Sequence, residues 1–201
     1  MSMHRTPAKH RGFTLIELMV TLTIAAVLAF AAVPSLTTYQ RNAELTSATN
    51  TLLAGINAAR GEAMKRGMNA MVLPADGLNW ISGWVVFVDK NRTQTYNPVS
   101  DTTVLTQGAL KNYFTVTGTG SASTATPGGP YLMYDASGYS KLKSGGFGAL
   151  TLTLNRNDVT GSVLIDQTRR IVIANTGRPR TCKPASATDA TCAASTSSNA
   201  N

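Results

Sequence analysis

The hydrophobic and polar positions along the chain separate an N-terminal apolar run from a longer mixed region. From Phe13 to Val33 every residue is apolar or carries a small hydroxyl group, except Glu17. At a rise of about 1.5 Å per residue, a helix over these positions spans the roughly 30 Å of a bilayer's hydrocarbon core. The pattern therefore predicts a transmembrane helix over residues 13–33.

After Pro34 the pattern changes from apolar on all sides to amphipathic. Apolar residues recur at steps of three and four, so residues 34–68 are predicted to form the amphipathic half of the same long helix. Pro34 is expected to remove one backbone hydrogen bond and to kink the helix. Gly67 is the expected end of a helix that runs from about Phe13 to Met68. The apolar stripe consists of Leu45, Ala48, Leu52, Ile56, Ala59 and Ala63.

Residues 69–183 carry the short apolar runs, alternations and turn residues that are typical of strands. A long helix followed by short strands predicts an α+β fold, in which the helix packs against an antiparallel β-sheet. A segment rich in small residues, 118–130, is predicted to be a flexible loop, and residues 184–201 form an Ala/Ser/Thr-rich tail. The predicted strands are 71–73, 83–88, 104–105, 113–116, 131–134, 150–154, 162–165 and 170–174.

The charged residues near the start of the apolar run indicate two different things: a carboxylate that needs a partner, and the orientation of the helix in the membrane. Glu17 is a carboxylate within the run, which is costly in lipid unless it meets a partner. The preceding residues carry Arg5, Lys9 and Arg11. Basic residues of this kind mark the cytoplasmic side of a membrane helix. The chain is therefore expected to cross the membrane once, with its C-terminal domain outside the cytoplasm.

The sequence Gly12-Phe13-Thr14-Leu15-Ile16-Glu17-Leu18 resembles the prepilin peptidase site of type IV pilins and type II secretion pseudopilins. The resemblance implies that prepilin peptidase removes a leader, residues 1–12, by cleaving between Gly12 and Phe13, and that the new Phe13 amine is methylated. It also implies that Glu17 pairs with the N-terminal amine of a neighbouring pilin subunit during assembly. The implied location is the bacterial inner membrane, with a periplasmic globular domain, and then an extracellular pilus.

Two other interpretations of the N-terminus stay open. An ordinary secretory signal could be cleaved at the small residues Ala29 and Ala31, and a generic single-pass anchor would not be cleaved at all. A secretory signal with so long an apolar region and an internal Glu17 is unusual. These features favour the pilin-like interpretation.

The composition limits which catalytic sites, metal sites and partners the rest of the chain can have. The formal net charge is +8, and removing the three basic leader residues from the 18 in the chain leaves 15 basic against 10 acidic residues. This balance permits an anionic partner without naming one. Both histidines, His4 and His10, lie in the leader. The mature chain therefore has no Ser–His pair, Cys–His pair or His-based zinc site, and we expect neither an enzyme nor a bound cofactor or metal.

Cys182 and Cys192 are the two cysteines of the chain. In an oxidising compartment they are expected to form a disulfide, which tethers the tail, residues 184–201, at Cys192. The alternative is a pair of free thiols in a mobile tail. Two cysteines alone are too few for a structural zinc site.

The last predicted strand opens the most basic window of the chain, which contains no acidic residue. Gly83-Trp84-Val85-Val86-Phe87-Val88-Asp89, with a terminal strand that ends at Thr176-Gly177-Arg178, is similar to the GspH/FimT subgroup of type IV pilin-like proteins. Within the window, Gly177-Arg178-Pro179-Arg180 matches the Gly-Arg-x-Arg motif of FimT-like minor pilins that bind DNA during natural transformation. The basic residues of the window are Arg169, Arg170, Arg178, Arg180 and Lys183.

The residue types of this motif suit a phosphate backbone. Gly177 permits a tight turn and Pro179 stiffens it, so little conformational entropy is lost on binding. The guanidinium groups of Arg178 and Arg180 can each bridge two phosphate oxygens, and Lys183 adds a third cation. Because no base-reading element is evident, we expect sequence-independent DNA binding.

Other cations are weaker candidates for the same role. Adjacent strand residues point to opposite faces, so at most one of Arg169 and Arg170 shares the surface of Arg178. We take Arg170 as the candidate. Lys141 and Lys143 lie on one side of the chain if that stretch is extended, and they would then enlarge the basic surface.

Two further patterns have both a structural and a functional interpretation. Trp80 and Trp84 are able to stack on bases, but beside an apolar strand they are expected in the core. Asp89, Asn91 and Thr93 have the spacing of oxygen ligands in a calcium loop. Without an acidic ligand downstream, a solvated hairpin turn is the expected structure.

Together these patterns favour a minor type IV pilin that binds extracellular DNA for uptake in natural transformation. The alternative is a structural subunit: a GspH-like pseudopilin of type II secretion, or a minor pilin that primes assembly without binding DNA. The Gly-Arg-x-Arg motif separates these functions only in part, because most exposed arginines do no more than solvate a loop.

Overall fold

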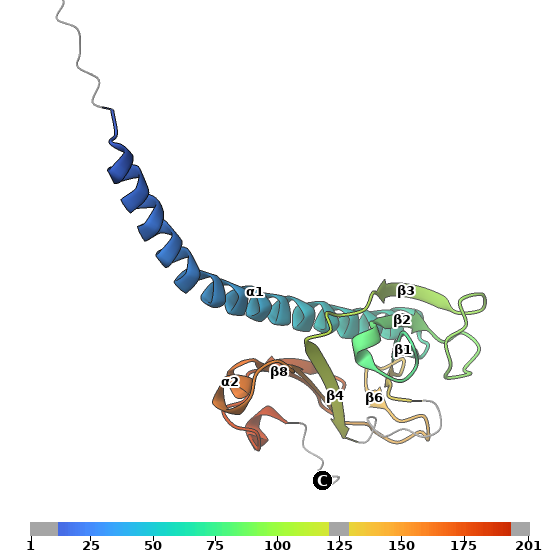
Figure 1. The fold of residues 1–201 in the computed structure, drawn as a ribbon. Helices are drawn as coiled ribbons and strands as arrows, with labels where there is room; N and C mark the ends of the chain where they lie inside the picture. Colours follow the sequence, from blue (N-terminus) through green and yellow to red (C-terminus); the bar gives the residue numbers. More distant parts are fainter. Residues whose placement is uncertain (1–11, 121–128, 194–201) are drawn as a thin grey trace, which may run out of the picture. The chain divides into compact units, whose positions relative to one another are not determined.

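A computed structural model describes residues 12–120 and 129–193, without the side chains of residues 31–35. The chain divides into two compact units, Met1–Arg41 and Asn42–Asn201, and Figure 1 shows the order of their elements. Most of the predicted leader, the centre of the predicted loop of small residues and the end of the predicted tail lie outside the described residues.

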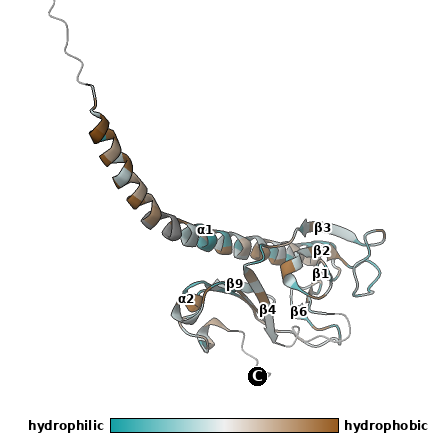
Figure 2. Cartoon of the chain, viewed as in Figure 1, coloured by the Kyte–Doolittle hydropathy of each residue, from teal (hydrophilic) through white to brown (hydrophobic). Residues whose placement is uncertain are grey.

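The first unit contains the start of helix α1, which spans Leu15–Arg66 and continues through Pro34. The Glu17 amide donates a hydrogen bond to the Thr14 hydroxyl at 3.2 Å, and the Thr14 amide donates to the Glu17 carboxylate at 2.9 Å. This reciprocal pair is a capping box. Apolar side chains are exposed along these turns, which are coloured as hydrophobic in Figure 2.

Within the part of the chain that the structure describes, no helix is both long enough and apolar enough to cross a membrane. The predicted segment, residues 13–33, includes three residues whose side chains are outside the described set. The transmembrane assignment stays a prediction.

The rest of α1 packs its apolar stripe into the core of the second unit. Leu45 and Leu52 are fully buried, as are three other members of the stripe, which confirms the amphipathic pattern. The helix stops just before Gly67, whose φ of 64° is left-handed. The Met68 amide donates to the Ala63 carbonyl at 3.2 Å. This Schellman arrangement satisfies a carbonyl group at the end of the helix.

Five strands form the first sheet, in the order β3-β2-β1-β5-β6, with antiparallel neighbours. β2 is buried along its whole length, and its residues share one core with the buried stripe of α1. Figure 1 shows β1, β2 and β3 along the C-terminal part of the helix. The bounds are Ala70–Pro74 for β1, Trp84–Val88 for β2, Thr102–Gln107 for β3, Leu132–Tyr134 for β5 and Ser140–Lys141 for β6.

Four strands form the second sheet, in the order β4-β7-β8-β9, again with antiparallel neighbours. Side chains alternate between the two faces of a strand. Leu150, Leu152 and Leu154 of β7 are buried together with Ile171 and Ile173 of β8, so one face belongs to the core. The bounds are Phe114–Gly120 for β4, Leu150–Arg156 for β7, Thr168–Ile173 for β8 and Pro179–Cys182 for β9.

The opposite face of the second sheet, called the outer face from here on, carries Arg170 of β8 and Arg180 of β9. Val172 pairs with Arg180 and Arg170 pairs with Cys182, so these four residues share that face. Arg169 lies on the other face, as strand alternation requires.

The predicted α+β architecture is confirmed, although two sheets take the place of one. Residues 118–120, predicted to start a loop, belong to β4 instead. Arg180, predicted to lie in a loop, belongs to the edge strand β9. The short 3-10 helices are η1, Trp80–Ser82, and η2, Ala190–Cys192.

The prediction of a strand over residues 162–165 is wrong, because these residues lie in helix α2, Gly161–Asp166. β7 is already paired on both edges, with β4 and β8, so the segment that follows it has no edge of β7 to join. Local hydrogen bonds satisfy its backbone instead, such as the bond from the Gln167 amide to the Val163 carbonyl at 3.0 Å.

Candidate functional site

The turn between β8 and β9 positions the two arginines of the Gly-Arg-x-Arg sequence. The Gly177 amide donates to the Ala174 carbonyl at 2.8 Å, which closes the turn. Gly177 has a φ of 79°, and a Cβ atom there would lie 1.9 Å from the Gly138 carbonyl oxygen. A side chain is therefore excluded both by backbone conformation and by direct packing on the neighbouring turn.

Arg178 and Arg180 line one hollow on the outer face. Both side chains are exposed. The Arg178 side chain makes no hydrogen bond or ion pair with any of the described residues, whereas the Arg180 guanidinium donates to the Thr191 carbonyl oxygen at 2.8 Å. The hollow has a volume of about 260 Å³, and its lining is Val172, Ala174, Thr176, Arg178 and Arg180.

The loop closed by the Cys182–Cys192 disulfide lies against the same face. The disulfide confirms the predicted pairing. The Arg170 guanidinium donates to the carbonyl oxygens of Ala187 at 2.9 Å and of Asp189 and Cys192 at 3.3 Å. Arg170 therefore clamps the loop onto the sheet. Carbonyl groups carry no net charge, so these bonds leave the positive charge of Arg170 uncancelled.

Asp189 organises the disulfide loop from within. Its carboxylate accepts hydrogen bonds from the amides of Ala185 and Thr191, both at 2.9 Å. These bonds, that of Ala185 above all, lower the pKa of Asp189 to about 2. Sequence reasoning did not single out Asp189, although an aspartate just before a helical turn is a helix-capping signal.

Lys183 has an acidic partner, which sequence reasoning did not predict. Its ammonium group lies 2.7 Å from Oδ1 of Asp166 in α2, and both side chains are exposed. The hydrogen bond and the charge of Lys183 hold the pKa of Asp166 below its usual value. The pairing offsets much of the charge of Lys183, which is therefore a weaker anion ligand than the two arginines.

Arg169 lies away from the outer face. Its guanidinium donates to Oδ1 of Asn42 in α1 at 3.0 Å, and burial lowers its pKa. The outer face still carries more cations than acids. The cations placed on this face are Arg170, Arg178 and Arg180, and the acid beside them is Asp189 of the disulfide loop.

Lys141 and Lys143 are held by neighbouring side chains and are not free cations. The Lys141 ammonium lies 3.9 Å from Oδ2 of Asp135 and 4.1 Å from the centre of the Phe147 ring. The Lys143 ammonium lies 4.7 Å from the centre of the Tyr131 ring, and burial lowers the pKa of Lys143. That either lysine enlarges the basic surface of the arginine pair stays a prediction.

The two patterns with competing interpretations are resolved by burial. Trp80 and Trp84 are buried in the core, which confirms the structural interpretation. Asp89 is fully buried, and its carboxylate accepts hydrogen bonds from the amides of Thr93 at 3.0 Å and Gln94 at 2.9 Å. The turn is present, but the expectation that it is solvated is wrong for Asp89. Among the described residues, no group of three or more His, Cys, Asp or Glu side chains could hold a metal ion.

The N-terminal motif surrounds the start of α1. Gly12 and Phe13 precede the helix and are exposed. The Glu17 carboxylate accepts hydrogen bonds from both the amide and the hydroxyl of Thr14, each at 2.9 Å. Glu17 therefore has a local partner in a single chain, while its side chain stays exposed to other molecules.

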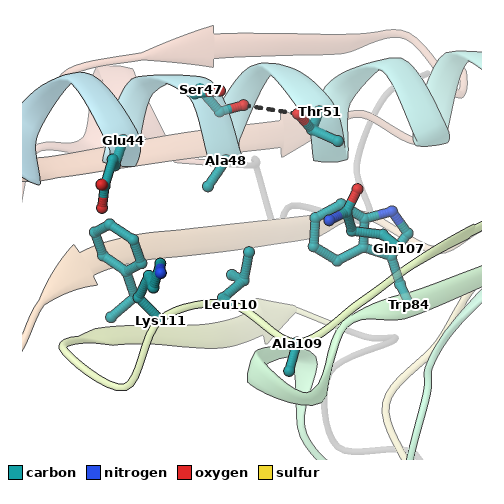
Figure 3. Close-up of a pocket in the computed structure, with 10 residues that line it drawn as sticks. Glu44, Ser47, Ala48, Thr51, Trp84, Gln107, Ala109, Leu110 and Lys111 are labelled. Atoms are coloured by element: carbon teal, nitrogen blue, oxygen red, sulfur yellow. Dashed lines mark hydrogen bonds between the residues drawn. The ribbon is translucent and has the colours of Figure 1, made fainter.

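A second hollow, of about 310 Å³, lies between α1 and the linker from β3 to β4. Figure 3 shows Glu44 and Ala48 projecting from α1 toward Leu110 and Lys111 of the linker. The Tyr113 hydroxyl donates to the Glu44 carboxylate. The lining residues include no histidine or cysteine, so they offer no Ser–His or Cys–His pair for nucleophilic catalysis.

The fold and the N-terminus define the type IV pilin-like class, because a long N-terminal helix packs on antiparallel sheets and the prokaryotic N-terminal methylation motif matches residues 7–33. The chain belongs to the GspH family, described as type II transport protein GspH, which matches residues 48–177. The methylation motif implies processing by a prepilin peptidase.

Two solved structures are similar to this chain. The type IV minor pilin FimU of Pseudomonas aeruginosa matches with a TM-score of 0.49 and 16% identity, over 68% of this chain and 91% of that chain. The minor pseudopilin EpsH from the type 2 secretion system of Vibrio cholerae matches with a TM-score of 0.49 and 15% identity, over 71% and 99%. No curated protein matches this sequence significantly.

Proposed function

We propose that this chain is a minor type IV pilin that binds extracellular DNA, without sequence preference, for uptake in natural transformation. The observation that carries the proposal is the pair of exposed guanidinium groups, Arg178 and Arg180, that line one hollow on the outer face. Neither has an acidic partner among the described residues, so both keep their charge for an anion. Planar guanidinium groups form strong bidentate bonds to phosphate oxygens.

The surroundings of the arginine pair support backbone contacts. The other residues of the hollow are small or apolar, so apart from the two arginines it holds no amide, carboxylate or cationic side chain of the kind that reads base edges. Such a site reads phosphate and not sequence. Lys183 adds less than the sequence suggested, because Asp166 offsets its charge. The site therefore engages two to three phosphates, with Arg170 adding longer-range attraction.

The proposed route to the surface starts in the inner membrane. Prepilin peptidase cleaves between Gly12 and Phe13, and the new Phe13 amine is methylated. Glu17 then meets the N-terminal amine of a neighbouring subunit as the filament forms. The exposure of Gly12, Phe13 and Glu17 supports each step, because all three must be reached by another protein.

The competing proposal is a purely structural subunit, either a GspH-like pseudopilin of type II secretion or a minor pilin that primes assembly. The family match supports this proposal as well as the first, since it ends at residue 177, one residue before Arg178. Under the competing proposal, the exposed arginines only solvate the β8–β9 turn.

The two proposals are separated by measuring DNA binding of the full chain in a neutral detergent. With a fluorescent duplex and anisotropy as the readout, the variant Arg178→Gln with Arg180→Gln is expected to raise the Kd at least about tenfold, because two charge-assisted contacts are lost. The matched control is Lys90→Gln with Arg92→Gln, which removes two exposed cations from the β2–β3 loop. Equal Kd values for the arginine variant and this control would rule out the assigned site.

A further inference from the structure

An exposed aromatic pair lies on the turns that flank β6. Tyr139 is 42% exposed and Phe147 is 54% exposed, and they are the exposed aromatic residues among the described residues of the second unit. Their ring centroids are 5.6 Å apart with an angle of 61° between the planes. The Lys141 ammonium lies over the Phe147 ring at 4.1 Å. Two touching exposed rings next to a cation form a surface suited to binding.

The backbone holds both rings in place without burying them. The Asp135 carboxylate accepts hydrogen bonds from the amides of Ser137 at 2.9 Å and Tyr139 at 3.0 Å. The Asp135 amide in turn donates a hydrogen bond to the Tyr139 carbonyl at 3.1 Å. Phe147 forms an antiparallel bridge with Lys141 of β6. The rings are therefore presented by ordered turns, so a ligand that stacks on them pays little ordering entropy.

The Tyr139 turn packs directly against the turn that carries Arg178. Gly177 approaches Gly138 so closely that an added Cβ atom would lie 1.9 Å from the Gly138 carbonyl oxygen. Bond lengths along this path place the Cα atoms of Arg178 and Tyr139 within roughly 11 Å of each other. The same Gly138 carbonyl accepts a hydrogen bond from Arg60 of α1 at 3.0 Å, which fixes the two turns to the helix.

We propose that Tyr139 and Phe147 stack on unpaired bases of a DNA strand whose phosphates are held by Arg178 and Arg180, so that the protein prefers single-stranded DNA to duplex. This inference rests on the proposed function. In a duplex the flat faces of the bases are covered by their neighbours, whereas a single strand presents them to aromatic rings. Because the two ring planes are inclined at 61°, each ring accepts a different base.

The proposal is tested with the full chain in neutral detergent, using a labelled oligothymidylate and a labelled duplex of equal length. The wild-type Kd for the single strand is expected to be at least about fivefold lower than for the duplex, the lower end of the effect of one stacked base. Tyr139→Ser with Phe147→Ser is expected to abolish this difference and to leave the duplex Kd unchanged. The aromatic exchange Tyr139→Phe with Phe147→Tyr is expected to keep the difference in Kd between single strand and duplex.

A second measurement avoids any effect of substitution on folding. The wild-type chain is titrated with an abasic oligonucleotide, which has the phosphates but no bases, and the Kd is expected to rise at least about fivefold relative to oligothymidylate. Val99→Ser, at a residue that is 93% exposed on another loop, is the control for loss of exposed apolar surface.

The outcomes separate this inference from the proposed function. Binding of neither DNA form by the wild type would overturn both. Binding of both forms with equal Kd, or of abasic and thymidine strands with equal Kd, would overturn the stacking proposal and leave phosphate binding intact. A Tyr139→Ser, Phe147→Ser variant that binds both DNA forms like the Val99→Ser control would also overturn the stacking proposal and leave phosphate binding intact.

Discussion

At Gly177, backbone conformation and long-range packing exclude any side chain. Substitution Gly177→Ala is expected to lower the free energy of unfolding by about 2–4 kcal/mol, since alanine is strained at this φ and its Cβ would overlap the Gly138 carbonyl. The change also displaces Arg178, so the DNA affinity of the folded variant is expected to fall. Urea unfolding followed by circular dichroism gives the first quantity, and anisotropy gives the second.

The control for this variant is Gly61→Ala on the exposed side of α1. A Cβ atom at Gly61 meets no atom within 4 Å, so the substitution is expected to stabilise the chain by about 0.5–1 kcal/mol through helix propensity. If Gly177→Ala were as harmless as Gly61→Ala, the packing assigned to the β8–β9 turn would be wrong.

At the same scale, the sequence singled out Arg178 and Arg180 as phosphate ligands but did not predict the partners of the neighbouring cations. A spacing of two residues puts side chains on one side of an extended chain, which is a local property. The pairing of Lys183 with Asp166 depends on how α2 and β9 meet, and no local pattern contains that information. Exposure of Tyr139 and burial of Tyr134 likewise depend on packing between distant segments.

At the scale of elements, the disulfide loop is expected to loosen in acid. Asp189 has a pKa of about 2 in the folded chain, against an ordinary value of 3.8. A group whose pKa is depressed by folding stabilises the fold above its unfolded pKa, and this contribution is lost as the pH falls through the folded value. The amides of Ala185 and Thr191 should therefore change their NMR shifts between about pH 4 and about pH 1, with a midpoint near the folded pKa of about 2.

Asp189→Asn is the matched control, because asparagine keeps an acceptor oxygen but does not ionise. In this variant the two amides are expected to show a flat pH profile over the same range. A midpoint near 3.8 in the wild type would contradict the assigned hydrogen bonds, because it would mean that the carboxylate gains nothing from them.

Elements with a strong local pattern were predictable, and those that depend on pairing were not. The apolar stripe of α1 fixed both the helix and its buried side, and Gly67 marked its end. Residues 162–165 are apolar or hydroxyl-bearing and were taken for a strand, but the availability of a neighbouring edge decides strand formation. β9 was missed because Pro179 suggested a loop, although proline is tolerated as the first residue of an edge strand.

At the scale of the whole molecule, the N-terminal unit is expected to govern assembly and the second unit to govern DNA binding. Glu17→Ala should leave leader cleavage intact yet reduce incorporation into pili at least about tenfold, because the neighbour's amine loses a charged partner. Immunoblots of sheared pili measure incorporation, and the size shift on removal of the leader measures cleavage.

Glu17→Gln distinguishes the pairing role from the capping role seen in the single chain. Glutamine can still cap the helix by accepting the Thr14 hydrogen bonds, but it carries no charge. Both Glu17 variants are expected to fail in assembly. Normal incorporation of Glu17→Gln would assign the residue to helix capping alone.

The salt dependence of DNA binding tests the central claim most directly, because it counts the phosphates that the protein neutralises. For two to three phosphates, the slope of log K against log salt on duplex DNA is expected to be about −2 to −3. In the Arg178→Gln, Arg180→Gln variant the slope should become shallower by about 1.8. A wild-type slope that the double variant leaves unchanged would contradict the account, because the arginine pair would then contact no phosphate.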